Sequence, residues 1–283
     1  MYYIIIGNGY IGNYLNENIK GSNLWVDKIY TKTDIRELLT WYPDGVIINA
    51  AGTTGKPNVD WCEDHKAETI LGNIHLPVMI AEVCAEMKRH WINIGSGCIY
   101  NGYEKNWTED DEPNFNESFY SYTKKEGQRL VNELPYSCTL RIRMPIDPFM
   151  GDRCLVTKLL TYVNAGNPVM SDLTNSMTCL DDLANIIKIV GDNKLEGTYN
   201  AVNKGSLSAT DILTLYKKYV YSTLTWKSET YDNLVSKGYI KAARSNCVLS
   251  TKKLESLYDV PHIVDRMFSI LKGYAEITGA CND

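Results

Sequence analysis

The chain has 283 residues, of which 44% are hydrophobic and 22% are charged, so it is neither a disordered nor a fibrous protein. Its formal net charge of -5 comes without any block of basic residues, which argues against binding to a nucleic-acid backbone. No apolar run approaches the roughly 20 residues that a membrane helix needs, and the first residues do not resemble a signal peptide. We therefore expect a cytoplasmic protein that binds neither nucleic acid nor a membrane.

Short apolar runs alternate with helix-like segments in the first half of the chain. The predicted strands are Tyr2–Ile6, Gly45–Asn49, Trp91–Ile94 and Cys138–Ile142. The helices predicted from apolar residues at helical spacing are Glu68–Arg89 and Lys124–Leu134. Buried strands separated by helices form a parallel sheet that is covered on both faces, so the pattern predicts a doubly wound α/β fold.

The second half of the chain is less regular. Its predicted helices are Cys154–Ala165, Leu180–Val190, Ser208–Tyr219 with Ser208 as the cap, Leu254–Leu257 and Ile263–Leu271. One further short strand is predicted at Thr198–Val202. No change in composition marks a boundary near residue 145, so we expect two interleaved parts rather than two separate domains.

A glycine fingerprint, G-x-G-x-x-G, follows the first predicted strand at Gly7–Gly12. Its first glycine permits a tight turn, its second lets the backbone approach a pyrophosphate, and its third packs the helix against the strand. The N–H groups at the start of that helix then bind the phosphates. We therefore predict a Rossmann-type dinucleotide-binding domain over residues 1–145, to which residues 171–203 return. Residues 146–170 and 204–283 would mainly form a smaller substrate-binding part.

The choice between NAD and NADP depends on charges after the fingerprint. Asp27 lies 20 residues after Gly7, where a carboxylate would bind a ribose hydroxyl, whereas Lys28 and Lys32 would meet a 2′-phosphate. Ordinary solvated loop charges explain these residues equally well. We expect NADPH as the cofactor, with NADH tolerated.

A Tyr-x-x-x-Lys motif at Tyr120 and Lys124 gains its meaning from context, because about 1.5 such pairs are expected here by chance. The spacing places both side chains on one helix face, and Ser96 stands at the carboxyl end of a predicted strand. A lysine beside the phenol would lower its pKa and make it a proton donor or acceptor near neutral pH. The hydroxyl of Ser96 would hold a carbonyl oxygen that becomes an oxyanion. The residues expected to contact the cofactor are Gly7, Asn8, Gly9, Tyr10, Ile11, Gly12, Asp34, Ile35, Ala50, Ala51, Gly52, Tyr120 and Lys124.

Metal binding has no support in the sequence. The eight cysteines include no Cys-x-x-Cys pair, and the four histidines lack the spacing of metal ligands. We expect no metal, and we expect most cysteines to be buried free thiols.

The fingerprint, Ser96, Tyr120 and Lys124 together resemble an extended short-chain dehydrogenase/reductase. Longer stretches resemble, more specifically, the bifunctional nucleotide-rhamnose synthase/epimerase-reductase family, which is related to dTDP-4-dehydrorhamnose reductase. These stretches are Asn49–Glu63, Arg141–Ile146, Asn175–Thr178 and Arg244–Asn246.

The resemblance implies a concrete reaction. A UDP-linked 4-keto-6-deoxy-D-glucose would be inverted at C3 and C5 and then reduced at C4 with NADPH, which gives UDP-L-rhamnose. A separate 4,6-dehydratase would make the substrate, and the enzyme would be a homodimer. The catalytic residues would be Ser96, Cys98, Tyr120, Lys124 and Lys158, and the substrate-binding residues would be Thr54, Asn175 and Arg244.

Residue chemistry agrees with the epimerase step. Inversion next to a ketone needs an acid on one face of the sugar and a base on the other. Cys98 lies two residues after Ser96, so both side chains would point to the same side of the sheet if the strand continued. A thiol is a suitable acid, and a partly buried Lys158 would be a suitable base.

Two alternatives remain open. A reductase without epimerase activity would have no need of a thiol at Cys98. A non-catalytic, dinucleotide-binding regulatory subunit would not need Ser96, Tyr120 and Lys124 together. Only the resemblance favours UDP over dTDP.

Overall fold

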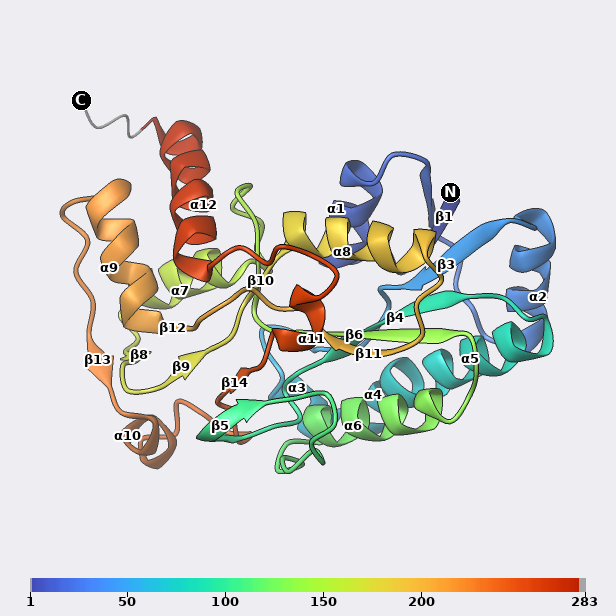
Figure 1. Ribbon diagram of the computed structural model, residues 1–283. Helices are drawn as coiled ribbons and strands as arrows, with labels where there is room; N and C mark the ends of the chain where they lie inside the picture. Colours follow the sequence, from blue (N-terminus) through green and yellow to red (C-terminus); the bar gives the residue numbers. More distant parts are fainter. Residues whose placement is uncertain (1, 280–283) are drawn as a thin grey trace.

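A six-stranded parallel sheet forms the centre of the computed structural model, which describes residues 2–279 (Figure 1). The strands are β1 (Tyr2–Ile6), β2 (Ser22–Trp25), β3 (Gly45–Asn49), β4 (Trp91–Ser96), β6 (Ser137–Ile142) and β11 (Gly197–Asn200). Their order is β11-β6-β4-β3-β1-β2, and every neighbouring pair is parallel. The predicted doubly wound α/β fold of the Rossmann type is confirmed.

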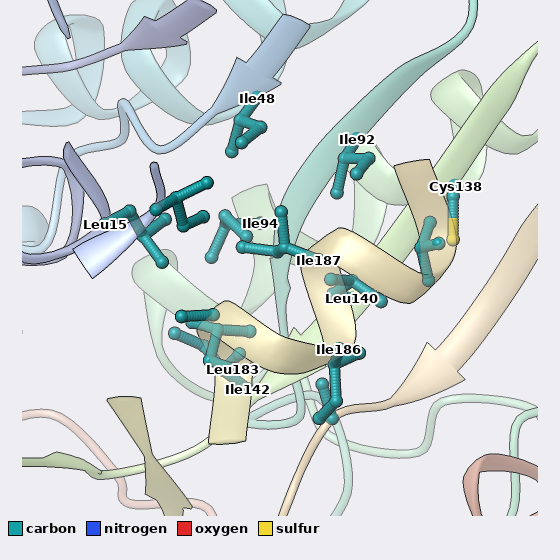
Figure 2. Close-up of a cluster of buried hydrophobic side chains, with 14 of the residues drawn as sticks. Leu15, Ile48, Ile92, Ile94, Cys138, Leu140, Ile142, Leu183, Ile186 and Ile187 are labelled. Carbon is teal, nitrogen blue, oxygen red and sulfur yellow. The ribbon is translucent and has the colours of Figure 1, made fainter. Parts of the chain in front are cut away.

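Helices cover both faces of the sheet because successive side chains of each strand point to opposite faces. In β1, Ile5 joins the core beneath α1 (Tyr10–Asn18) and α8 (Leu180–Asp192), whereas Ile4 joins the core on the other face. Figure 2 shows the first of these cores, in which isoleucines of β3 and β4 meet leucines of α1 and α8. The helices on the second face are α2 (Lys32–Trp41), α5 (Leu76–Glu86) and α6 (Phe119–Asn132).

The helix predicted over Glu68–Arg89 is interrupted. It consists of α4 (Lys66–Ile70), a π-helical turn at Leu71–His75 and then α5. The extra residue of a π-turn rotates the following side chains, and such turns are frequent at functional sites. The strand β2 and the helix α2 were not among the predicted elements.

The second part of the molecule packs α7 (Leu155–Asn164), α9 (Ala209–Tyr219) and α12 (Ile263–Thr278) around a separate apolar core. Ser208 caps α9 as predicted, with a reciprocal bond to Asp211. Short strand pairs frame this part: β7 (Pro145–Ile146) with β10 (Thr178–Cys179), β8 (Val169–Met170) with β13 (Ser228–Glu229), and β9 (Thr174–Asn175) with β12 (Leu207–Ser208). The remaining helix here is α10 (Tyr231–Ser236).

The two parts interleave along the chain. β11 joins the central sheet and α8 covers it, although both follow segments of the second part in the chain. Leu254 of α11 (Lys252–Glu255) and Val260 also lie in the core of the sheet, although residues 204–283 were assigned mainly to the second part.

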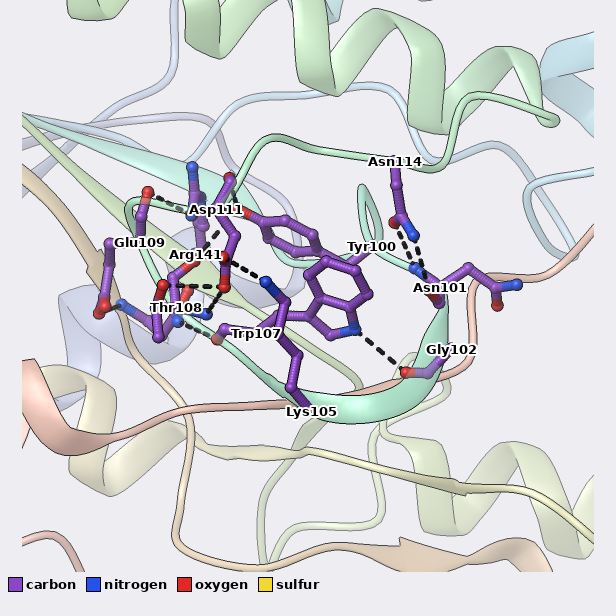
Figure 3. A network of polar contacts seen from close by, with 11 residues as sticks. Tyr100, Asn101, Gly102, Lys105, Trp107, Thr108, Glu109, Asp111, Asn114 and Arg141 are labelled. Atoms are coloured by element: carbon purple, nitrogen blue, oxygen red, sulfur yellow. Dashed lines mark hydrogen bonds and ion pairs between the residues drawn. The ribbon is translucent and has the colours of Figure 1, made fainter.

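The long loop between β4 and α6 contains β5 (Gly102–Trp107), which pairs with β14 (Cys247–Leu249). Asp111 ties the loop together by accepting hydrogen bonds from the backbone N–H and the hydroxyl of Thr108, both at 2.8 Å (Figure 3). Arg141 of β6 donates to the Tyr100 hydroxyl at 2.8 Å, which attaches the loop to the sheet.

Within residues 2–279, no helix is long and apolar enough to cross a membrane. The same residues contain no group of three or more His, Cys, Asp and Glu side chains placed to hold a metal ion. Six of the seven described cysteines are buried, all seven are free, and Cys98 is partly exposed. Cys281 lies outside the described residues.

Candidate active site

The glycine loop after β1 has the geometry of a phosphate-binding turn. Gly7 has a φ of 110°, and a Cβ there would lie 2.6 Å from the backbone nitrogen of Ala51. A Cβ on Gly12 would lie 1.8 Å from the carbonyl oxygen of Gly7, so α1 packs directly on the loop. Gly9 is the N-cap of α1. A Cβ at this position would meet open space, and no side chain caps the helix. The first N–H groups of α1 are therefore available to a diphosphate, and the loop fits a dinucleotide.

The loop lies where the strand order reverses, between β1 and β3, which is the crevice that binds ligands in open α/β sheets. The backbone N–H of Ala50 donates to the Ile6 carbonyl at 2.9 Å and joins the two strand ends. A Cβ on Gly52 would lie 3.3 Å from Oδ1 of Asn73 and 3.9 Å from Nζ of Lys124. This turn of small residues therefore connects the glycine loop with Lys124.

Ser96, Tyr120 and Lys124 come together at the carboxyl end of β4. Ser96 is the last residue of β4, and the hydroxyl of Tyr120 donates to its Oγ at 3.4 Å. Nζ of Lys124 donates to the Ile94 carbonyl oxygen at 3.1 Å. Tyr120 and Lys124 lie one turn apart on α6, as their spacing predicts.

Two side chains hold the first turn of α6, which carries Tyr120. The hydroxyl of Ser118 caps the helix by accepting the N–H of Ser121 at 3.2 Å. The carboxylate of Glu63, from α3 (Trp61–Asp64), accepts the N–H of Phe119 at 2.7 Å. A carboxylate at a helix N-terminus is stabilised by the helix dipole, so α3 anchors this end of α6.

Burial dominates the acid–base properties of the pair on α6. Burial raises the pKa of Tyr120. The nearby Cys98 adds to this rise, whereas the hydrogen bond with Ser96 opposes the rise. Burial lowers the pKa of Lys124 to about 8, against the opposing effect of Cys98. The sequence predicts that Lys124 lowers the pKa of Tyr120; in the structure, desolvation of the phenol is the largest influence on that pKa.

Cys98 lies close to Ser96, but not in the way expected. The strand β4 ends at Ser96, so the condition that it continues to residue 98 is not met. The chain turns instead, and the N–H of Cys98 donates back to Oγ of Ser96 at 3.1 Å. The turn results from this bond between a serine side chain and the backbone two residues later.

Lys158 stands on α7, in the second part of the molecule. Burial, assisted by the positive charge of Arg153, lowers the pKa of Lys158 to about 8. A substantial fraction of the amine is therefore neutral near physiological pH. Within the described residues, no hydrogen bond or ion pair joins Lys158 to Cys98.

The loop after β3 meets the second part through two arginines. Arg153 donates to Oγ1 of Thr54 and, at 2.9 Å, to the carbonyl oxygen of Gly55. Arg244 pairs with Asp60 at 2.7 Å, and both side chains are partly buried. Burial would raise the pKa of Asp60, but the hydrogen bond from Arg244 helps to hold it below its usual value. Thr54 and Arg244, both predicted to bind substrate, thus lie on this contact between the two parts.

Asn175 is buried within a polar network. It accepts a hydrogen bond from Arg143 and donates to Oδ1 of Asn246 at 3.0 Å. The backbone N–H of Cys247 also donates to Oδ1 of Asn175, at 3.1 Å. Its polar atoms are therefore engaged with protein groups.

The residues considered for the adenosine end of the cofactor have structural partners. Asp34 completes a capping box at the start of α2, where it accepts the N–H of Thr31 at 2.9 Å. Ile35 is fully buried in the core of the sheet. Lys32 pairs with Glu82 at 3.1 Å, whereas Asp27 and Lys28 are exposed just beyond β2.

Sequence reasoning did not single out Asn73, Arg143 or Arg153. Asn73 lies in the π-turn and donates from Nδ2 to the Thr53 carbonyl oxygen at 2.9 Å and to the Thr123 hydroxyl at 3.1 Å. It thereby links the turn after β3 to α6. A π-turn has no sequence signature here, and the two arginines become notable only through contacts between segments distant in the chain.

Comparison with known proteins agrees with this geometry. Residues 4–264 match the family described as RmlD substrate binding domain. The chain is 37% identical to the bifunctional dTDP-4-dehydrorhamnose 3,5-epimerase/dTDP-4-dehydrorhamnose reductase of Arabidopsis thaliana, over 80% of this chain and 75% of that protein. It is also 37% identical, over 87% of its length, to a trifunctional UDP-glucose 4,6-dehydratase/UDP-4-keto-6-deoxy-D-glucose 3,5-epimerase/UDP-4-keto-L-rhamnose-reductase of the same plant. It spans 36% of that longer protein.

Solved structures show the same fold. The UDP-rhamnose synthase of Acanthamoeba polyphaga mimivirus superposes with a TM-score of 0.88 at 29% identity, over 96% of this chain and 99% of that one. A dTDP-4-dehydrorhamnose reductase from Bacillus anthracis, in complex with NADP, superposes with a TM-score of 0.81 at 18% identity, over 95% of this chain and 98% of that one. The resemblance seen in the sequence is confirmed, and this chain belongs to the RmlD substrate binding domain family.

Proposed function

We propose that this protein converts UDP-4-keto-6-deoxy-D-glucose into UDP-L-rhamnose by epimerisation at C3 and C5 followed by NADPH-dependent reduction at C4. The observation that carries the reductase half is the meeting of Ser96, Tyr120 and Lys124 beside the glycine loop. The 37% identity with a bifunctional epimerase/reductase and the likeness to a UDP-rhamnose synthase support the substrate class.

In the reduction, NADPH supplies the hydride for C4 when it is bound. Tyr120 gives its phenolic proton to the C4 oxygen, which suits a phenol whose pKa is raised by burial. Ser96 donates a second hydrogen bond to the same oxygen and stabilises the developing charge. Lys124, held by the Ile94 carbonyl, places a buried amine beside the turn that would face the cofactor.

In the epimerisation, the C4 ketone makes the protons on C3 and C5 removable, because the resulting enolate places its charge on the C4 oxygen. The hydroxyls of Ser96 and Tyr120 stabilise that charge as they do in the reduction. We assign the base to Lys158, whose lowered pKa leaves it partly neutral, and the acid on the opposite face to Cys98. The bond from the Cys98 N–H to Ser96 keeps residue 98 beside the hydroxyl that would bind the C4 oxygen.

The nucleotide diphosphate would bind where the loop after β3 meets the second part. Arg244 and Arg153 bring two guanidinium groups to this contact, and guanidinium forks suit phosphate oxygens. The 4-keto group itself must be made by a 4,6-dehydratase, which we assign to a site other than this one. We further propose that the enzyme acts in the cytoplasm as a homodimer.

The proposal is tested by incubating the protein with UDP- or dTDP-4-keto-6-deoxy-D-glucose and with NADPH or NADH. Consumption of the reduced cofactor and formation of the L-rhamnose nucleotide, identified by NMR, are the expected results. Reduction without inversion would support a reductase alone, and binding of NADPH without turnover of any 4-keto sugar would support a regulatory subunit. The same assay compares the rate with the UDP-linked sugar to the rate with the dTDP-linked sugar, and the rate with NADPH to the rate with NADH.

A further inference from the structure

Arg143 carries a buried positive charge that has no acidic partner. The residue follows β6 and is 1% exposed. Its guanidinium donates to four acceptors, all of them neutral: Gly97 O at 2.9 Å, Ser245 Oγ at 2.8 Å, Ser245 O at 3.1 Å and Asn175 Oδ1. Among residues 2–279 it belongs to no ion pair, and its Nε has no hydrogen-bond partner.

Such an arrangement is costly for folding. Removing a guanidinium from water costs free energy, and hydrogen bonds to neutral acceptors offset that cost only in part. A buried apolar side chain would fill the same volume without this cost. The charge of Arg143 therefore points to an effect on the groups that its guanidinium contacts.

The neighbour that matters is the peptide unit between Gly97 and Cys98. Arg143 donates to the carbonyl oxygen of this unit, and the N–H of the same unit donates to Oγ of Ser96 at 3.1 Å. A Cβ on Gly97 would lie 2.9 Å from Cγ of Arg143, so the peptide lies close against the arginine stem. A cation on the carbonyl side polarises the peptide and strengthens its N–H as a donor.

Ser96 receives the effect. A hydroxyl has two acceptor sites and one hydrogen to donate. Its Oγ accepts the hydrogen bond from the Cys98 N–H, so its own hydrogen can be donated to a substrate oxygen when the neighbouring Tyr120 hydroxyl turns to that oxygen as well. The charge of Arg143 also acts on three titratable groups, which are Tyr103, Tyr120 and Cys247. Burial raises the pKa of each group, and the charge of Arg143 opposes that rise.

We propose that Arg143 is a positioning residue for the chemistry at C4, which orients and polarises Ser96 through the Gly97–Cys98 peptide. This inference rests on the proposed function. Arg143 would act on the C4 oxygen only through Ser96. It would not touch the substrate, because protein atoms enclose its guanidinium.

The test is a double-mutant cycle between Arg143→Lys and Ser96→Ala. Lysine keeps the charge but lacks the planar fork that reaches Gly97, Ser245 and Asn175 together. We expect Arg143→Lys to lower kcat for C4 reduction about tenfold, with KM for the sugar nucleotide and for NADPH nearly unchanged. In the Ser96→Ala background the same change should lower kcat less than about twofold, because the group on which Arg143 acts is gone.

A matched control lies two residues earlier on β6. Arg141 is also buried, but it donates to the Tyr100 hydroxyl at 2.8 Å (Figure 3). It also donates to Oε1 of Gln128 at 3.2 Å, and no hydrogen bond joins it to Gly97. Any loss from Arg141→Lys should be equal in both backgrounds. Equal losses for Arg143→Lys in both backgrounds would show that Arg143 is only structural and would overturn the inference.

A second variant covers the case in which Arg143→Lys does not fold. Asn175→Asp keeps an oxygen acceptor for Arg143 and adds a carboxylate that neutralises its charge. We expect kcat to fall several-fold, and this fall should again depend on Ser96; an unchanged kcat would overturn the inference. Wild-type turnover is measured first: its absence would contradict the proposed function itself, whereas normal turnover with independent losses contradicts only the role of Arg143.

Discussion

The phenolic oxygen of Tyr120 lies 3.4 Å from Oγ of Ser96, although the two hydroxyls come from different elements of the fold. Ser96 ends β4 and Tyr120 belongs to the first turn of α6, so the pair forms only when the helix packs on the sheet. In the proposed function, both hydroxyls bond to the same carbonyl oxygen of the substrate.

Tyr120→Phe should lower kcat for C4 reduction by about 10² to 10⁴-fold, because the phenolic proton has no substitute at that position. The rate of NADPH oxidation with the 4-keto sugar nucleotide measures it. Tyr122→Phe is the matched control, since Tyr122 lies on the same helix but is 43% exposed. A Tyr120→Phe enzyme as fast as the wild type would show that the residue is structural.

Epimerisation should be separable from reduction, since moving protons next to a ketone needs no nicotinamide. In D₂O without NADPH, the wild-type enzyme should incorporate deuterium at C3 and C5 of the 4-keto sugar, as followed by NMR. Cys98→Ala should lose exchange at one or both carbons, whereas Tyr120→Phe should retain part of it. Exchange by Cys98→Ala at the wild-type rate would refute the epimerase role and leave a reductase alone.

Exchange should also depend on pH through Lys158, whose pKa is lowered to about 8. Only the neutral amine accepts a proton, so the exchange rate should rise with pH up to about 8 and level off above it. Lys158→Met should remove this rise. Arg153→Gln takes away a positive neighbour and should shift the rise to higher pH, although burial, the larger cause, remains. An identical pH profile in Lys158→Met would contradict the assignment of the base.

Stability should depend on an ion pair that ties α12 to α8. Asp182 is buried and accepts two bonds from Arg266, at 2.6 and 2.8 Å. Arg266→Met should lower the free energy of unfolding by about 3 kcal/mol, because a buried carboxylate loses its cation. The exposed Arg129, which pairs with Glu126 and Glu133, is the control, and its replacement by Met should cost less than about 1 kcal/mol. Equal shifts of the urea midpoint for the two variants would contradict this difference.

The sequence alone determined most strands of the sheet and the glycine loop, because these are encoded by neighbouring residues. The apolar runs at Tyr2–Ile6 and Gly45–Asn49 match β1 and β3 residue for residue. The fingerprint could be recognised from its spacing, since Gly7 and Gly12 are required by close contacts within the strand–turn–helix unit or with the adjoining strand end, and Gly9 leaves space beside the start of the helix. The shared face of Tyr120 and Lys124 followed from helical periodicity in the same way.

The tertiary structure decided what depends on contacts between distant segments. The N–H of Cys98 bonds back to Ser96 where β4 ends, and burial raises the pKa of Tyr120. Ile35 is enclosed by the core because α2, which the pattern did not reveal, packs there. Arg143 is unremarkable in the sequence, and its isolated charge emerges only when Gly97 and Ser245 close around it. Local patterns specify elements, whereas desolvation and long-range hydrogen bonds determine the chemistry of their side chains.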